Sequence, residues 1–433
     1  MSKNLGFWSV FAIVIGSQMG SGVFMLPASL APYGQYGFLG WLVSGIGAIC
    51  LALVFSGLCH RFPRTGGPHV YVKEMFGANA AFFTGWTYWV ISWISTTAVI
   101  IASISYLSPF IPNASCHLEL SLEILLLIAM TYLNLKGIEA AGKAEFILTV
   151  LKIIPLLILP IIAMFYFNAD NILIAPSIHL NSHTSNLAHV TLLTLWGFIG
   201  LETATTPAGS IDNPSKTIPK AIVLGTITTA LLYMLNCIGI MGMIPSAKLA
   251  LSKAPYVDAT QYLFGGQWHL LIAVIAFIVC VGTLNAWILA SGQIALGLAE
   301  DKLLPEAFKQ KNKYQAPRLG IIISCLGIIP LLWLTRNPMI SNQITAIIDF
   351  SVIAFLFVYL ISVIAYMKTL IKEHAKIYHW IYTLMALIFC IWTILQTPIL
   401  TIMTSSLFVV SGIPVYFLWY LKNQQILPLL NLE

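Results

Sequence analysis

Residues 12–27 read AIVIGSQMGSGVFMLP, an apolar segment interrupted by three glycines and two serines. A glycine inside a helix costs about 1 kcal/mol relative to alanine. Gly16 and Gly20 alone would fit close helix packing, since small residues let membrane helices approach one another. The cluster Gly20-Ser21-Gly22 instead favours a local loss of helix, and unwound backbone at membrane depth is tolerated only where it lines a cavity or is buried in protein. We therefore predict a broken helix whose backbone forms a binding surface.

The chain around this stretch has the composition of a membrane protein. Of its 433 residues, 59% are hydrophobic and 8% are charged, whereas a soluble domain carries about 25% charged residues. Apolar runs of about 20 residues cross a bilayer, and they recur along nearly the whole chain. We predict one all-α integral membrane domain over 1–433, and we read the first apolar segment as a retained helix rather than a cleaved leader. The predicted spans lie near 8–31, 36–58, 80–109, 121–135, 144–167, 188–208, 220–243, 269–299, 319–335, 343–367, 378–396 and 400–421.

The basic residues predict the orientation of these spans. When alternate loops are grouped, eighteen of the 21 Lys and Arg residues collect on one side, with Lys152 counted among them. The other side holds only Lys248, Lys253 and Arg336. Loops rich in Lys and Arg stay in the cytoplasm. We therefore predict a multi-pass protein of the cell (inner) membrane with both termini in the cytoplasm.

A second interrupted span reads TLWGFIGLETATTPAGS at 194–210, with Pro207 and three glycines in it and Glu202 near its middle. A carboxylate inside the bilayer is expensive and is a functional candidate by default. Interrupted helices at corresponding positions of two halves point to an inverted-repeat transporter with its site at the midplane. We predict repeats over about 8–167 and 188–367, followed by two helices over about 378–421. The broken ends would offer amide groups and a positive dipole end to a carboxylate.

Other classes of protein find little support. The sequence shows no HExxH, no His pair at metal spacing, no Ser-His-Asp order and no phosphate-binding glycine motif, so we expect neither an enzyme, nor an ATP-driven pump, nor a cofactor, nor a metal site. Ringed charges and repeated filter loops, which a channel would need, are not apparent. The dispersed basic residues do not suggest nucleic-acid binding. We expect the partners to be a small-molecule substrate, the lipid bilayer and a second copy in a homodimer.

The motifs, taken in order, resemble the amino acid–polyamine–organocation superfamily. They are G-S-Q-M-G-S-G-V-F-M-L-P, P-R-T-G-G-P-H-V-Y-V-K-E-M-F-G, W-T-Y-W-V-I-S-W, L-W-G-F-I-G-L-E-T-A-T, D-N-P-S-K-T-I-P-K-A, G-M-I-P-S-A-K-L-A-L-S-K-A-P-Y-V-D-A, Trp287 and E-D-K-L-L-P. Within the superfamily the chain is most similar to the bacterial basic amino acid/polyamine antiporters, above all to the arginine/agmatine exchangers. The resemblance runs from about residue 6 to residue 370 and implies a LeuT-like fold of five-plus-five helices with helices 1 and 6 broken.

The resemblance also implies which residues bind substrate. Backbone amides and the hydroxyl around Ser21 and Gly22 would take the α-carboxylate, and carbonyl groups near Trp196 and Ile199 would take the α-amino group. Trp287 would lie over the distal cation, which agrees with the attraction of about 0.5–2 kcal/mol between an aromatic face and a cation. The alternative for any membrane Trp is interfacial anchoring. The implied substrate-binding set is Ser17, Gly20, Ser21, Gly22, Ile91, Ser92, Thr96, Trp196, Ile199, Trp287 and Ser351.

The same resemblance implies a gate. Trp196 would close the pocket toward the outside, and Tyr88 and Tyr359 would belong to the cytoplasm-facing and distal gating layers. Glu202 matches a carboxylate linked to gating and to the response to pH. A structural hydrogen bond to a neighbouring helix is the alternative role for Glu202.

Several positions depart from the family pattern. Where arginine exchangers carry asparagine, this chain has Ser17 and Thr96, and small residues of the distal pocket become Ile91 and Ser92. These changes would shrink the pocket and remove an amide partner. Asp349 is a candidate extra partner for a cation, or a helix-start residue near the headgroups.

The function predicted from these residues is secondary antiport of a cationic amino acid against its amine or another amino acid. The alternative is a proton-coupled symporter or a uniporter of neutral amino acids with the same fold. No intramembrane acid is apparent beside the first break, so sodium coupling is not indicated.

Overall fold

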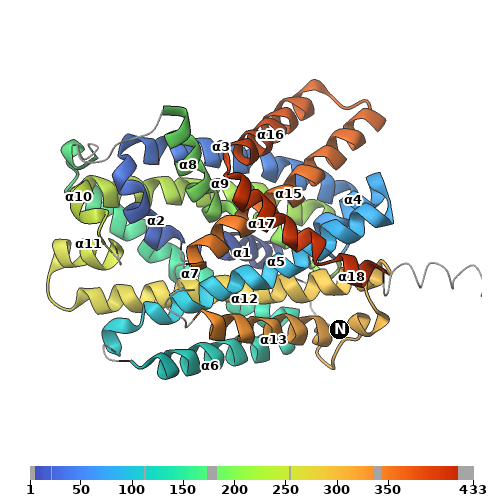
Figure 1. The fold of residues 1–433 in the computed structure, drawn as a ribbon, viewed down its shortest axis with the longest axis horizontal. Helices are drawn as coiled ribbons and strands as arrows, with labels where there is room; N and C mark the ends of the chain where they lie inside the picture. Colours follow the sequence, from blue (N-terminus) through green and yellow to red (C-terminus); the bar gives the residue numbers. More distant parts are fainter. Residues whose placement is uncertain are drawn as a thin grey trace, which may run out of the picture.

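The computed structural model describes residues 5–20, 22–111, 114–172, 183–252, 255–335 and 343–417, without the side chains of 183–185 and 343–349. Within these ranges α-helices and short 3₁₀ turns are joined by loops, and no β-strand forms (Figure 1). Among the residues that the structure describes, ten helical segments are long and apolar enough to cross a membrane, and Arg318–Leu334 and Ile399–Val415 are shorter apolar helices. The predicted all-α membrane fold is confirmed.

The described helices are α1 (Phe7–Gln18), α2 (Gly22–Leu30), α3 (Gln35–Arg61), α4 (Pro68–Phe76), α5 (Ala78–Ser105), α6 (Cys116–Leu135), α7 (Ile138–Met164), α8 (His183–Leu195), α9 (Pro214–Met243), α10 (Ser246–Leu249), α11 (Pro255–Phe264), α12 (Trp268–Glu300), α13 (Arg318–Leu334), α15 (Gln343–Lys372), α16 (Ile377–Gln396), α17 (Ile399–Val410) and α18 (Ile413–Val415). The long helices lie within a few residues of the predicted spans, whereas α4, α10 and α11 are short helices between them.

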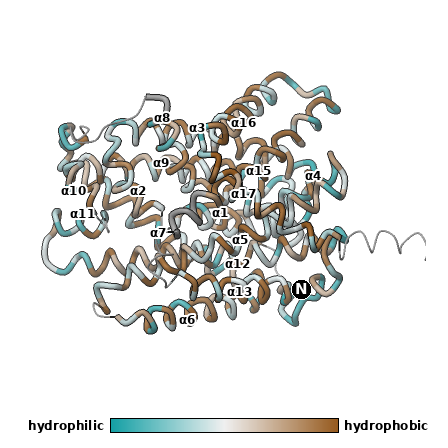
Figure 2. The backbone as a smooth tube through the Cα atoms, viewed as in Figure 1, coloured by the Kyte–Doolittle hydropathy of each residue, from teal (hydrophilic) through white to brown (hydrophobic). Residues whose placement is uncertain are grey.

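The broken first span lies at the centre of the molecule. Helix α1 packs against α7, α9 and α12, while α5 runs along α12 and α3 packs against α9. Helices α6 and α13 lie side by side at the lower margin of Figure 1. Hydrophobic residues follow the long helices, and hydrophilic residues gather toward their ends (Figure 2). This pattern suits a bundle whose outer surface faces lipid.

One helix contact shows how the bundle tolerates proline. Pro160 lies inside α7 and has no N–H group, so it leaves the carbonyl of Leu156 without its helical partner. The amide of Asn236 on α9 donates to that carbonyl at 2.7 Å. Gly239, one turn later, lets α9 approach closely, since a Cβ there would lie 2.9 Å from Pro160 Cα. A neighbouring helix thus satisfies the freed backbone group, as the lipid interior requires.

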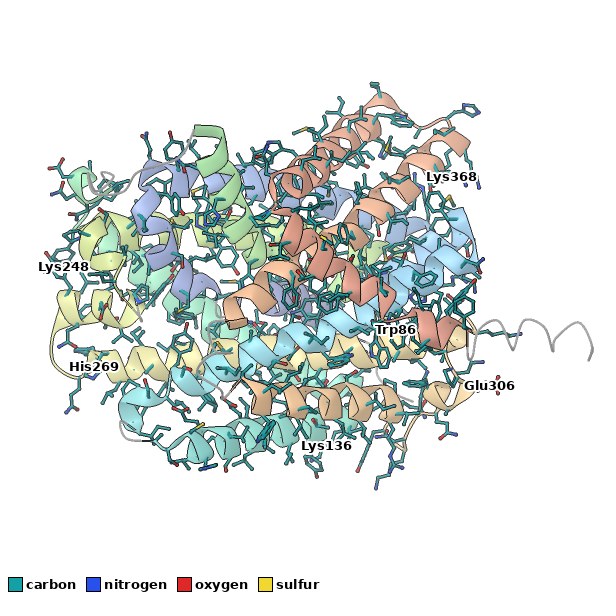
Figure 3. All side chains as sticks on the ribbon, in the orientation of Figure 1. Trp86, Lys136, Lys248, His269, Glu306 and Lys368 are labelled. Carbon is teal, nitrogen blue, oxygen red and sulfur yellow. The ribbon has the colours of Figure 1, made fainter. Side chains whose placement is uncertain are left out.

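Ion pairs connect the helices at one end of the molecule. We call it the Lys-rich end, and it carries Arg61, Lys73 and Lys368. Lys368 and Glu306 are labelled there in Figure 3. Lys73 on α4 donates to Asp301, directly after α12, at 2.6 Å. Burial acts to raise the pKa of Asp301, but the His69 imidazole 3.3 Å away and the hydrogen bond from Lys73 outweigh it and lower the pKa to about 2. A hydrogen bond from Arg61 likewise lowers the pKa of Glu373. Both carboxylates therefore stay ionised near neutral pH, and their ion pairs with Lys73 and Arg61 are maintained.

One basic residue is misplaced in the sequence-based loop assignment. Lys152 lies in the middle of α7 and is fully buried, and it does not belong to a loop. A single charged residue near the expected end of an apolar run can belong either to the helix or to the loop beside it. The sequence pattern alone does not distinguish these two positions. The Lys and Arg asymmetry between the two sides survives this correction.

Candidate functional site

The first break separates α1 from α2. Helix α1 ends at Gln18, and Met19 leaves helical geometry with a ψ of 84°. Helix α2 starts at Gly22, while Ser21 lies outside the described residues. The first amides of a helix have no partner inside it. The start of α2 therefore presents N–H groups and a positive dipole end.

The second break follows α8. After Leu195 the chain continues in short 3₁₀ turns, the first of them Trp196–Phe198, and Ile199 between them is extended. Gly200 has a φ of 102°, which favours glycine. A Cβ at Gly200 would lie 3.0 Å from both Ser17 Cβ and Trp287 Cζ2. Glycine is therefore required here both for backbone conformation and for close approach.

Ser17 joins the two breaks. Its hydroxyl lies 2.8 Å from the carbonyl oxygen of Gly200 and 2.7 Å from the hydroxyl of Thr203. The indole N–H of Trp287 on α12 donates to the Ser17 carbonyl at 3.2 Å. One residue of the first break is thus held by both the second break and the aromatic residue expected over the substrate.

A small, partly enclosed cavity lies between the breaks. Its volume is about 20 Å³, which holds little more than one water molecule. No lining residue is acidic or basic. The cavity is therefore too small for an amino acid in this conformation, and the partly buried side chain of Trp196 belongs to its wall. The lining residues are Ser17, Gln18, Gly20, Gly22, Ser95, Val99, Trp196, Gly197, Ile199, Thr283 and Trp287.

Most of the predicted binding residues on the broken helices and α12 meet at this cavity, but those on α5 and α15 do not. From α5 the cavity wall receives Ser95 and Val99. Thr96 is buried, and its hydroxyl donates to the carbonyl of Ser92 at 2.5 Å. Ile91 and Ser351 are buried elsewhere. The roles of Ile91, Ser92, Thr96 and Ser351 remain predictions, and the side chain of Asp349 lies outside the described residues.

The predicted gating residues form a buried layer next to the second break. The hydroxyl of Tyr359 donates to Glu202 Oε2 at 2.5 Å and accepts from the N–H of Gly200 at 3.2 Å. Tyr88 and Glu202 are both fully buried, and neither the Tyr88 hydroxyl nor Glu202 Oε1 has a hydrogen-bond partner among the described residues. An unsatisfied buried polar group costs about 1–3 kcal/mol.

A buried ion pair behind the first break was missed in the sequence. Lys152 donates to the carbonyls of Gly16 and Met19 at 3.1 and 3.3 Å. The hydroxyl of Thr283 lies 2.8 Å from the same two oxygens. Glu145, also fully buried on α7, lies 3.8 Å from the Lys152 ammonium. We call Glu145 and Lys152 the α7 ion pair.

This pair overturns the expectation that no acid stands beside the first break. Glu145 accepts from Asn285 at 2.8 Å, and a Cβ on Gly16 would lie 1.8 Å from Glu145 Oε1. The spacing of Glu145, Thr149 and Lys152 places all three on one helix face. The i, i+4, i+7 spacing of these polar residues was the sequence signal that could have indicated a polar face on this helix. Only the fold shows that this face contacts the first break.

These features define a class of protein: a multi-pass helical membrane protein with two broken helices around a central cavity. The family described as amino acid permease matches residues 5–421, and the chain belongs to this family, which confirms the resemblance to its superfamily. The cadaverine/lysine antiporter of Escherichia coli (strain K12) is 29% identical over 336 residues, 76% of this chain and 74% of that protein.

Two further relatives cover more of the chain. A putative arginine/ornithine antiporter of Bacillus subtilis (strain 168) is 29% identical over 409 residues, 86% of this chain and 85% of its own. The putrescine transporter PotE of Haemophilus influenzae (strain ATCC 51907 / DSM 11121 / KW20 / Rd) is 29% identical over 367 residues, 84% of each chain.

Replacing Gly22 by Leu should abolish substrate binding. A Cβ at Gly22 would already lie 3.1 Å from Trp196 Cδ1, so a Leu side chain would fill the cavity and push Trp196 aside. Isothermal calorimetry on the purified protein tests this. Gly6→Leu is the matched control, because nothing lies within 4 Å of a Cβ at Gly6. Normal binding by a folded Gly22→Leu protein would contradict the placement of the site.

Breaking the α7 ion pair should destabilise the protein more than removing both members. Lys152→Met leaves Glu145 as an unpaired buried charge, which costs about 3–5 kcal/mol, whereas replacing both charges is often close to neutral. Thermal unfolding in detergent should therefore show a large loss for Lys152→Met and a partial recovery for the double variant with Glu145→Gln. Additive losses in the two single variants would show that the charges act independently.

Proposed function

We propose that this chain is a secondary antiporter that exchanges a cationic amino acid for its amine or for another amino acid. The observation that carries the proposal is the neutral cavity between two broken helices that meet at Ser17, with Trp287 in its wall. The printed names of the relatives, which concern lysine, arginine, ornithine, cadaverine and putrescine, support the substrate class.

The cavity suggests how such a substrate binds. The free amides at the start of α2 suit an α-carboxylate, and the ring of Trp287 suits a distal ammonium or guanidinium. The cavity wall offers no carboxylate to hold that cation. An aromatic face gives a moderate attraction, which permits release on the other side of the membrane. Glu202 and its tyrosine layer would then couple proton state to opening.

The proposal includes the orientation and the repeat. The Lys-rich end would face the cytoplasm of the cell, together with both termini, and the protein would reside in the inner membrane. Residues 8–167 and 188–367 would form the inverted repeats, with one break in each. Since both breaks and the cavity belong to one chain, each subunit of a homodimer would transport independently. We expect no covalent chemistry, cofactor or nucleic-acid partner.

The α7 ion pair favours a second candidate function, proton-coupled transport of neutral amino acids. Carbonyls of Gly16 and Met19 and the hydroxyl of Thr283 converge on one point, as ligands of a cation would, and the Lys152 ammonium occupies it. A titratable group at the broken end gives protons a route to influence opening. Such a carrier would not require an exchange partner.

Exchange in proteoliposomes separates the two candidates. Labelled lysine should enter only vesicles loaded with lysine, ornithine, arginine or a diamine, and external cadaverine, putrescine or agmatine should compete. Uptake into vesicles without internal substrate, driven by a pH gradient and inhibited by neutral amino acids, would overturn antiport and favour the second candidate.

In the same assay Trp287→Leu keeps bulk but removes the aromatic face. A cationic substrate should lose roughly 2–30-fold in affinity, equivalent to about 0.5–2 kcal/mol, and Trp287→Phe should lose less. Neutral competitors provide the control, because their affinity should change equally in both variants. If the Leu variant binds the cationic substrate as wild type does, Trp287 only packs.

Glu202→Gln should flatten the pH profile of exchange. Glutamine keeps the shape and accepts the hydrogen bond from Tyr359 but cannot ionise, so any balance between conformations set by this carboxyl loses its pH dependence. Exchange rates measured from acidic to neutral pH test this. Glu306→Gln, which removes an exposed carboxylate at the Lys-rich end, is the control and should leave the profile unchanged. An unchanged profile in Glu202→Gln as well would leave Glu202 a structural role.

A further inference from the structure

A second pocket, of about 400 Å³, lies at the Lys-rich end, far along the chain from both breaks. It occupies the corner where α6 ends and α13 begins, and these two helices pack side by side. Lys136 is labelled at the lower margin of Figure 3, outside the ribbon of α6 and α13. The residues that line the pocket are Tyr132, Leu135, Lys136, Asn312, Lys313, Tyr314 and Arg318.

The wall of this pocket is built by specific contacts. The Asn312 side chain donates to the carbonyl of Leu135 at 2.6 Å and accepts from the N–H groups of Tyr314 and Ala316 at 2.8 and 3.1 Å. Gly137, with a φ of 100°, lets the α6–α7 turn approach the loop, since a Cβ there would lie 2.4 Å from the Tyr314 carbonyl oxygen. The loop before α13 is thereby fixed against the end of α6.

The pocket carries uncompensated positive charge. Lys136, Lys313 and Arg318 take part in none of the ion pairs formed between described residues, and no acid lines the pocket. The Lys136 ammonium lies over the ring of Tyr132 at 4.7 Å. Arg318 is the first residue of α13, whose N-terminal end adds a partial positive charge. Three cations around one hollow suit an anion with several oxygen atoms, and a phosphate is the common group of this kind.

The surfaces beside the pocket are apolar and face outward. On α6, Leu125, Ile128 and Tyr132 are 62%, 57% and 62% exposed, and their spacing places them on one face that leads directly to Lys136. On α13, Leu326 lies two turns after Arg318 on the same face and is 57% exposed. Both cationic helix ends therefore adjoin exposed apolar side chains, which in a membrane would face the lipid.

We propose that this pocket binds the phosphate of an anionic phospholipid, with its acyl chains along the exposed strips of α6 and α13. Basic pockets between membrane helices at the end that carries the positive charge recognise such headgroups. A free phosphorylated metabolite shares the phosphate chemistry, but it would leave the two adjoining apolar strips unused. The chemical class is a phosphodiester lipid such as phosphatidylglycerol or cardiolipin.

Native mass spectrometry of the purified full-length protein tests the proposal by titration with phosphatidylglycerol. The test variant is Lys136→Gln/Lys313→Gln/Arg318→Gln. Each surface cation contributes roughly fivefold to affinity for anionic lipid, so the triple variant should lose about a hundredfold. The single variant Lys313→Gln, in an exposed loop, should lose roughly fivefold in affinity for phosphatidylglycerol. It provides a test that does not depend on correct folding of the triple variant.

The matched control is Lys216→Gln/Lys372→Gln/Lys376→Gln, which removes the same charge from exposed lysines that do not line the pocket. It should retain the wild-type affinity. Equal losses in the two triple variants, or equal retention of phosphatidylcholine and phosphatidylglycerol by the wild type, would overturn the site. Displacement of the lipid by glycerol phosphate at a similar concentration would overturn the lipid in favour of a soluble phosphate.

Discussion

The carbonyl oxygens of Gly16 and Met19 impose the constraint on which the site depends. A helix that stops inside a membrane leaves backbone groups without partners, and each costs several kcal/mol in lipid. Lys152 from α7 donates to both oxygens, and the Thr283 hydroxyl from α12 lies within hydrogen-bonding distance of each and can donate to either one. The broken helix is therefore stable only where α7 and α12 converge, which explains why α1 lies at the centre of the bundle.

Gly200 connects the cavity with the gating layer. Its carbonyl accepts hydrogen bonds from Ser17 and Thr203, and its N–H donates to Tyr359, which in turn donates to Glu202. A displacement of this one residue breaks contacts on both sides at once. Packed elements of this kind tend to have discrete arrangements instead of a continuous range. The second break thus lines the cavity and also contacts the buried layer of Tyr359 and Glu202.

The sequence predicts the spans and both breaks because their signals are local. Hydropathy gives the length of each span, and clusters such as Gly20-Ser21-Gly22 weaken a helix wherever the chain folds. The residues that α5 contributes to the cavity wall were harder to predict. Ser95 and Val99 line the cavity, whereas the Thr96 hydroxyl donates to a carbonyl of its own helix. The rotation of a helix within a bundle depends on its neighbours, and a helix that is apolar on all sides carries little information about it.

The α7 ion pair illustrates the same limit and also explains the neutrality of the site. Glu145 and Lys152 lie seven residues apart on the inner face of α7. Their role depends on contact with the broken end of α1, which the sequence does not predict. An unpaired ammonium behind the first break would repel a cationic substrate in the cavity, and the repulsion would be strong because little water screens it there. Glu145, held by Asn285 and Thr149, cancels that charge. The protein can therefore use a lysine to satisfy its broken helix and still keep the lining of the cavity free of acidic and basic side chains.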